Sequence, residues 1–135
     1  MPNPPKIDPA RRHSRVGPVQ LPAEGRQGEP PEWPLRGPMS VAERATWAYL
    51  WTLPQAVMWE KQNITHTVGR YCRLLVEAED GATAAMHAVI TALEDRLGMT
   101  PKAMRLLMWQ VAEDEVSQKR TEAGPGARRR FKAVD

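Results

Sequence analysis

The fold is decided by one stretch, Met99-Thr-Pro-Lys-Ala-Met-Arg-Leu-Leu-Met-Trp-Gln-Val-Ala-Glu-Asp-Glu115. It contains its own helix start, because Thr100 is a good cap and Pro101 fits the first helical position, directly after the helix-ending Gly98. Apolar residues then recur at steps of three and four, which predicts one stripe: Met104, Leu107, Met108, Val111 and Ala112. A lone helix does not bury such a stripe, so we expect the preceding segments to supply the partner surface.

Further helices are predicted upstream of this stretch. Ser40-Val-Ala-Glu43 has the spacing of a capping box and opens a helix to about Thr52, and Pro54 then forces a break before a short helix over 55–61. Two longer amphipathic segments cover 63–79 and 83–97, with a turn signal between them. The short connection predicts that these two helices form an antiparallel hairpin. No alternating strand pattern of useful length occurs, so we predict an all-α fold.

The helical stripes also define the residues expected in the core or between copies of the chain. These are Trp47, Trp51, Trp59, Leu75, Met86, Val89, Leu93, Met104, Leu107, Met108 and Trp109. Trp47 and Trp51, four residues apart, are an alternative platform for stacked bases, but this spacing favours the core. If the last helix extends to Glu122, it is about 33 Å long at 1.5 Å per residue.

Proline content divides the chain into three parts. Ten of the thirteen prolines fall in residues 1–38, which we predict to be a disordered arm with Trp33 docked on the body or on a neighbouring copy. Residues 39–122 form the predicted helical domain, and residues 123–135 form a basic tail. A folded part this small is marginal in stability, so we expect oligomerisation to supplement it.

Positive charge is concentrated at the two ends of the chain. The net charge is +3, yet residues 39–122 carry nine basic and eleven acidic residues. Basic arms on a near-neutral body suggest contact with nucleic acid, although such arms also serve as solubilising tails. The cations predicted to contact DNA are Arg11, Arg12, Arg15, Lys102, Arg105, Arg128, Arg129, Arg130 and Lys132.

The sequence offers no residue constellation for catalysis, a cofactor or a metal. Cys72 is the single cysteine, which excludes an intramolecular disulfide, and His66 falls on a different side of the predicted helix. Glu113, Asp114 and Glu115 would point about 100° apart on a helix and so would not converge on one ion. No signal peptide and no run approaching about 18 apolar residues is present. We therefore expect a non-enzymatic, soluble, intracellular protein.

Two segments carry a resemblance to a known family. They are Trp51-Thr-Leu-Pro-Gln-Ala-Val-Met-Trp-Glu60 with Val68-Gly-Arg-Tyr-Cys-Arg-Leu-Leu-Val-Glu-Ala-Glu79, and Leu97-Gly-Met-Thr-Pro-Lys-Ala-Met-Arg-Leu-Leu-Met-Trp-Gln-Val-Ala-Glu-Asp-Glu115. Both resemble the small terminase subunits of tailed bacteriophages, in the branch common among phages of actinobacteria. The distinctive pattern is Leu-Gly-x-Thr-Pro-x-Ala-x-Arg-x-Leu-x-Trp. One departure is Met108, where we expect a basic residue.

The resemblance implies a non-enzymatic protein of the host cytoplasm that assembles into a ring and recognises double-stranded viral DNA. It also implies that the ring presents this DNA to the large terminase subunit, which carries the ATPase and the nuclease. The basic tail is expected to contact either DNA or the protein partners. A competing interpretation is a dimeric DNA-binding regulator, in which the turn at Gly98 belongs to a helix-turn-helix and the helix from Lys102 reads the DNA.

Overall fold

The computed structural model describes residues 17–113. This part of the chain is mostly helical, as predicted, with one small sheet that the sequence did not predict. Its elements in chain order are β1 (Val19–Leu21), α2 (Val41–Leu50), α3 (Ala56–Lys61), α4 (Thr65–Glu79), α5 (Ala84–Arg96), α6 (Pro101–Leu107) and β2 (Trp109–Val111).

Local capping signals fix where α2 and α6 begin. The Ser40 hydroxyl accepts a hydrogen bond from the Glu43 backbone N–H, and the Glu43 carboxylate accepts one from the Ser40 backbone, which completes the predicted capping box. At α6, the Thr100 hydroxyl accepts from the Ala103 N–H at 3.1 Å, and Pro101 occupies the first turn. Both helix starts are therefore confirmed.

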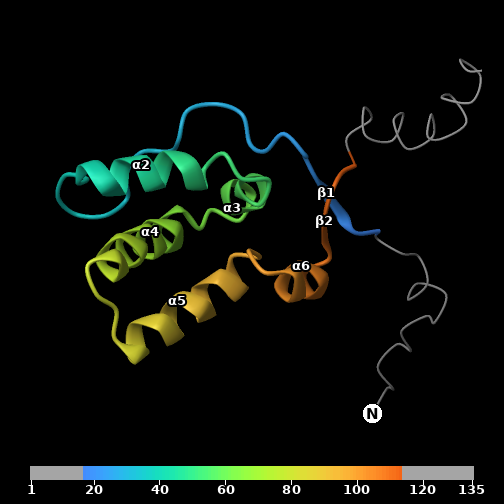
Figure 1. The fold of residues 1–135 in the computed structure, drawn as a ribbon. Helices are drawn as coiled ribbons and strands as arrows, with labels where there is room; N and C mark the ends of the chain where they lie inside the picture. Colours follow the sequence, from blue (N-terminus) through green and yellow to red (C-terminus); the bar gives the residue numbers. More distant parts are fainter. Residues whose placement is uncertain (1–16, 114–135) are drawn as a thin grey trace, which may run out of the picture.

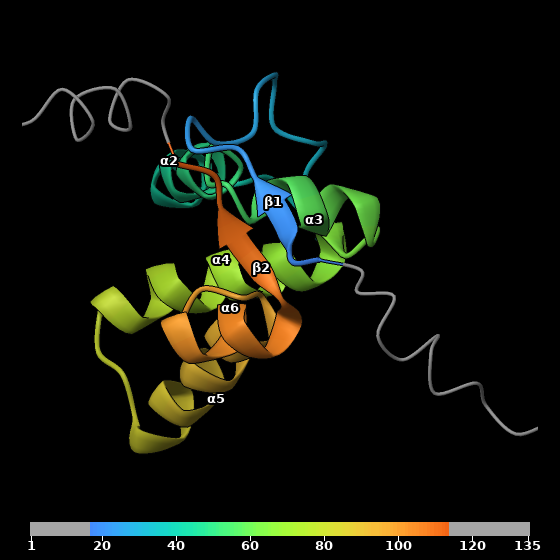
Figure 2. The same cartoon turned by 90° about the vertical axis from the view of Figure 1, so that its right-hand side faces the viewer.

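The three longest helices form the body of the molecule. Helix α4 lies between α2 and α5 and contacts both (Figure 1). Residues 80–83 connect α4 to α5, and Thr83 caps α5 by accepting a hydrogen bond from the Met86 N–H. Helices α3 and α6 lie at one end of this body, next to the sheet (Figure 2).

Four tryptophans form the centre of the core. Trp33, Trp47, Trp51 and Trp59 contact one another in sequence through edge-to-face pairs, with ring centroids 5.1, 5.5 and 5.7 Å apart. Trp47, Trp51 and Trp59 are at most 2% exposed. Because their faces are covered, these rings are core residues and are not available to stack on bases.

The predicted long last helix is wrong, because α6 ends at Leu107 after seven residues. Met108 adopts a left-handed conformation, with φ 58°, which stops the helix. The next residues form β2, which pairs in parallel with β1 so that Val19 lies opposite Trp109 and Leu21 opposite Val111 (Figure 2). The fold is therefore mostly helical but not all-α.

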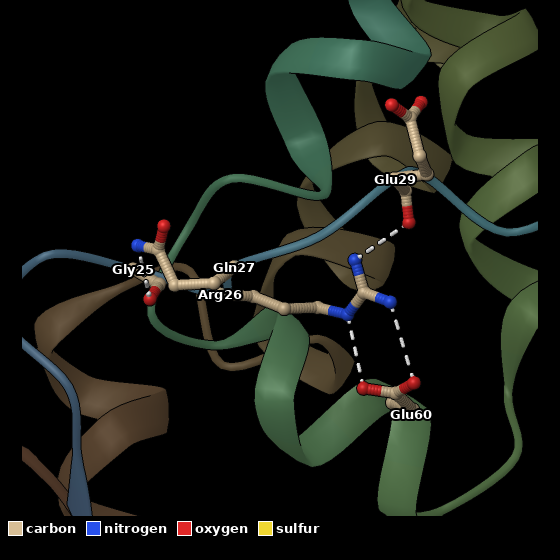
Figure 3. Close-up of polar contacts among 5 residues, drawn as sticks. All are labelled: Gly25, Arg26, Gln27, Glu29 and Glu60. Carbon is tan, nitrogen blue, oxygen red and sulfur yellow. Dashed lines mark hydrogen bonds and ion pairs between the residues drawn. The ribbon is translucent and has the colours of Figure 1, made fainter.

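The predicted disordered arm is wrong for residues 17–38. Leu21 is fully buried, and the carbonyl of Pro31 accepts a hydrogen bond from Trp47 Nε1 at 2.9 Å. Arg26 is clamped to α3, where its guanidinium donates two hydrogen bonds to the Glu60 carboxylate at 2.9 and 3.3 Å (Figure 3). It also donates to the Glu29 carbonyl at 3.1 Å. Apolar and charge-assisted contacts of this kind order a proline-rich segment that lacks helix or strand periodicity.

The other predicted core residues divide by exposure. Leu93 and Trp109 are buried, and Leu75, Met86 and Met104 are partly buried. Val89, Leu107 and Met108 are 47, 38 and 53% exposed, so their assignment to the core of a single copy is wrong. For Leu107 and Met108 the reason is the end of α6, since the stripe assumed a helix that continues beyond them.

Candidate functional site

The turn between α5 and α6 is a tightly packed unit. Gly98 has φ +71°, and a Cβ atom added to it would lie 2.2 Å from the Trp109 ring. Leu97 is fully buried, and its carbonyl accepts a hydrogen bond from Trp59 Nε1 at 2.8 Å. Ala103 is also buried, at 4% exposure. These residues of the Leu-Gly-x-Thr-Pro-x-Ala-x-Arg-x-Leu-x-Trp pattern therefore stabilise the turn and fix α6 against the core.

The outer side of α6 carries an unusual combination of cationic and apolar side chains. We call it the α6 surface, and its members are Lys102, Arg105, Leu106, Leu107 and Met108. Leu106 is 76% exposed, more than any other large apolar residue of the described part except Val41. Within residues 17–113, neither Lys102 nor Arg105 forms an ion pair. Exposed apolar side chains beside free cations are typical of a binding surface.

A hollow of about 220 Å³ lies beside the α6 surface. Its walls are formed by Asp95 of α5 and by Lys102, Ala103, Leu106 and Leu107 of α6. The Asp95 carboxylate accepts a hydrogen bond from the Thr100 hydroxyl at 2.8 Å, which ties the end of α5 to the start of α6. The hollow therefore has apolar walls with one acid and one base at its edge.

A second hollow, of about 290 Å³, lies on α4, and we call it the α4 hollow. It is lined by Leu35, Arg70, Arg73, Leu74 and Glu77. Sequence reasoning missed it, because Leu35 comes from the segment predicted to be disordered. Residues 70, 74 and 77 share one face of α4 by their helical spacing, which is the only signal in the sequence for this site.

Arg73, which lines the α4 hollow, is held in place by contacts with Glu43 and Trp33. Its Nε donates to Glu43 Oε2 at 3.0 Å, and its guanidinium lies 5.4 Å from the Trp33 ring centroid. Arg70 and Glu77 form no ion pair within the described residues. The lining of the α4 hollow therefore combines Leu35 and Leu74 with a cation and an anion that have no ion-pair partner among residues 17–113.

The environment of Glu43 determines its charge state. Burial raises the pKa of this carboxyl, but hydrogen bonds from Ser40 and Arg73 and the positive charge of Arg73 outweigh burial and lower it below 4.5. Glu43 is therefore ionised at neutral pH. It connects the start of α2 to the middle of α4 and supports the wall of the α4 hollow.

Cys72 is a structural thiol. It is fully buried and lies against the Glu43 carbonyl, with Sγ 3.4 Å from the oxygen. Burial and the Glu43 charge raise the pKa of the thiol to about 11. A thiol in this state is a poor nucleophile at neutral pH. Among residues 17–113, no group of three or more His, Cys, Asp or Glu side chains is placed to hold a metal ion.

Two of the nine cations predicted to contact DNA lie in the described part, and both are on the α6 surface. They are Lys102 and Arg105, which are exposed. The other seven lie outside residues 17–113: Arg11, Arg12, Arg15, Arg128, Arg129, Arg130 and Lys132. The predicted basic tail, 123–135, also lies outside this range.

No helix within residues 17–113 is both long enough and apolar enough to cross a bilayer, and the longest, α4, has 15 residues. Comparisons with known protein families, with curated proteins and with solved structures found no match.

Proposed function

We propose that this chain is a small terminase subunit, which assembles into a ring, binds double-stranded viral DNA and presents it to a large terminase subunit. In this proposal the chain is not an enzyme and acts in the cytoplasm of the bacterial host. The ATPase and the nuclease belong to the large subunit, and the small subunit recognises the DNA and regulates its partner.

The observation that carries the proposal is the α6 surface. It combines exposed Leu106 with two cations, Lys102 and Arg105, that form no ion pair within residues 17–113. Apolar exposure of this kind supports self-assembly, and the cations support contact with phosphates. The segment that builds this surface is also the one that resembles the terminase family.

The alternative is the dimeric helix-turn-helix regulator. Its reading helix would be α6, which spans only seven residues and carries just two cations. Recognition helices in such proteins present three or four side chains to base edges in the major groove. The short α6 favours the terminase proposal over this alternative.

The proposal is tested by measuring DNA binding across a salt series. The expected result is binding to duplex DNA with a steep salt dependence, about 0.9 in the slope of log affinity against log salt for each phosphate neutralised. A chain truncated after Ala123 lacks Arg128, Arg129, Arg130 and Lys132 and should show a smaller slope. If the truncated chain keeps the slope and the affinity, the tail serves the protein partners instead.

A second experiment tests the regulatory role. Mixed with a large terminase subunit, the chain should change the ATPase rate of that subunit. The purified chain alone should neither hydrolyse ATP nor cut DNA. Metal-dependent cleavage that copurifies with the chain and is lost on substituting Glu113, Asp114 and Glu115 would contradict the proposal.

A further inference from the structure

The two strands of the sheet are the first and the last elements of the described part of the chain. β1 precedes every helix and β2 follows every helix, and the two strands pair in parallel with Val19 opposite Trp109. Because they are parallel, the chain enters β1 at one end of the pair and leaves β2 at the other end (Figures 1 and 2). For strands of three residues, the entry and the exit are about 10 Å apart at about 3.3 Å per residue. Residues 1–16 and 114–135 therefore join the described part at opposite ends of one strand pair.

Backbone hydrogen bonds close the strand pair at both ends. At the entry, the Val19 N–H donates to the Met108 carbonyl, with 2.8 Å between nitrogen and oxygen. At the exit, the Ala112 N–H donates to the Leu21 carbonyl at 2.7 Å. Both distances are at the short end of the range for such bonds. A pull that moves β1 toward its start and β2 toward its end loads these bonds at the same time, because the strands then separate only by sliding past each other.

The strand pair is also fastened to the core. A short two-stranded sheet is at best marginally stable alone in water. Here Leu21 is fully buried and Trp109 is 6% exposed, so each strand places one side chain in the core cluster. Beyond β1 the chain is held again at Arg26, whose guanidinium is paired with the Glu60 carboxylate of α3 (Figure 3). Sliding of the strands therefore requires Leu21 or Trp109 to leave the core.

We propose that the β1–β2 pair is a shear clamp, which keeps the fold intact when the two ends of the chain are pulled apart. A pull between the ends loads the hydrogen bonds of the clamp together, whereas a pull applied at one end of the pair breaks them one after another. While the clamp holds, Trp109 stays packed against Gly98 and α6 keeps its place. This inference goes beyond the proposed function and does not depend on it, since it concerns only how the chain carries tension between its ends.

Two pulling directions on the full-length chain test the clamp in optical tweezers. In the first direction, DNA handles are attached at residues 1 and 135, so the load enters at opposite ends of the strand pair. In the second direction, one handle is at residue 1 and the other is a maleimide handle on the Leu106→Cys variant. Leu106 is 76% exposed and lies three residues before β2, at the same end of the pair as the start of β1. Cys72 is fully buried, so the native chain takes the handle at position 106.

The expected result is a higher unfolding force in the first direction than in the second, at the same loading rate. Forced unfolding is governed by the unfolding rate, so bonds that must break together raise the force that the fold withstands. The two directions stretch nearly the same part of the fold, residues 17–113 in the first and 17–106 in the second, so chain length does not account for a difference. Equal forces in the two directions, or a lower force in the first, would overturn the clamp.

A matched pair of variants tests the hydrogen bond at the exit of the clamp. Ala112→Pro removes the N–H that donates to the Leu21 carbonyl, and Val111 before it is already extended, as a following proline requires. Ala112→Ser keeps this N–H. Pulled at residues 1 and 135, Ala112→Pro should unfold at a lower force than wild type, and Ala112→Ser should unfold at the wild-type force.

Circular dichroism melting shows whether each variant is folded before it is pulled. An unchanged unfolding force for folded Ala112→Pro would overturn the clamp. If Ala112→Pro does not fold, the comparison of the two pulling directions still decides, because it leaves the strand pair unaltered.

Discussion

Substituting Gly98 by alanine should destabilise the protein strongly, and this effect depends on where the structure places Trp109. An added Cβ would lie 2.2 and 2.5 Å from two atoms of the Trp109 ring, well inside the contact distance of about 3.5–4.0 Å between carbon atoms. The ring is 6% exposed and belongs to β2, which pairs with β1, so it has little room to move. The turn or the ring must therefore shift.

The magnitude follows from two contributions. A residue with a Cβ at the positive φ of Gly98 costs roughly 1–2 kcal/mol. Forcing an extra methyl group into a packed interior typically costs about 1–3 kcal/mol more. We expect a total loss of about 2–5 kcal/mol in the free energy of unfolding for Gly98→Ala.

Gly37→Ala is the matched control, because it isolates the backbone contribution. Gly37 has a similar φ of +80°, and an added Cβ there meets nothing within 4 Å. For a domain of this size, 1 kcal/mol corresponds to about 4–8 °C in Tm. Thermal unfolding should therefore give a Tm for Gly98→Ala at least about 4 °C below that of Gly37→Ala.

A third variant tests whether the Trp109 ring causes the extra loss of stability in Gly98→Ala. Replacing the ring in Trp109→Leu should remove most of the extra cost of Gly98→Ala, so the two substitutions should be strongly non-additive. Equal Tm values for Gly98→Ala and Gly37→Ala, or additive effects in the double variant, would refute the packing of Trp109 against this turn.

Three further outcomes are expected. Leu93→Ala should lower the free energy of unfolding by about 2–5 kcal/mol in chemical denaturation, because Leu93 is 9% exposed and packs in the core; an unchanged midpoint would contradict this placement. Burial raises the pKa of Glu43, but hydrogen bonds from Ser40 and Arg73 outweigh burial and hold the folded pKa below its ordinary value. The stability that ionised Glu43 adds is therefore present above the unfolded pKa and is lost as the pH falls through the folded pKa. Wild type should thus lose more stability than Glu43→Gln on acidification, and parallel pH profiles would show otherwise. Cys72 should react with a maleimide at neutral pH only as fast as the protein unfolds, and rapid labelling of the native chain would show that the thiol is accessible.

The sequence predicted those features of the fold that depend on local signals. The capping box at Ser40 and the Thr100-Pro101 start of α6 are confirmed because each consists of residues within one helical turn. The burial of Trp47 and Trp51 also follows from their spacing of four residues.

The sheet was not predictable in the same way. Each strand has three residues, too few to show a period, and their paired residues Gln20 and Gln110 are 90 positions apart. The order of residues 17–38 depends on equally distant contacts, such as that of Arg26 with Glu60, 34 positions away. Interactions across such separations leave no periodic signal in either segment.

The candidate site was predicted in part. Lys102 and Arg105 were identified as surface cations, and the structure exposes both. Leu107 and Met108 were assigned to a buried stripe because nothing in the sequence marked the left-handed conformation of Met108. The α4 hollow was missed because it joins one face of α4 to Leu35, from a segment without periodicity.

Native mass spectrometry of the full-length wild-type chain at tens of micromolar shows whether the chain assembles into a ring. The proposed ring predicts one dominant species containing more than two copies, with the same subunit number across a range of protein concentrations. A dimer would support the regulator instead, and a chain that remains monomeric at these concentrations would contradict the account.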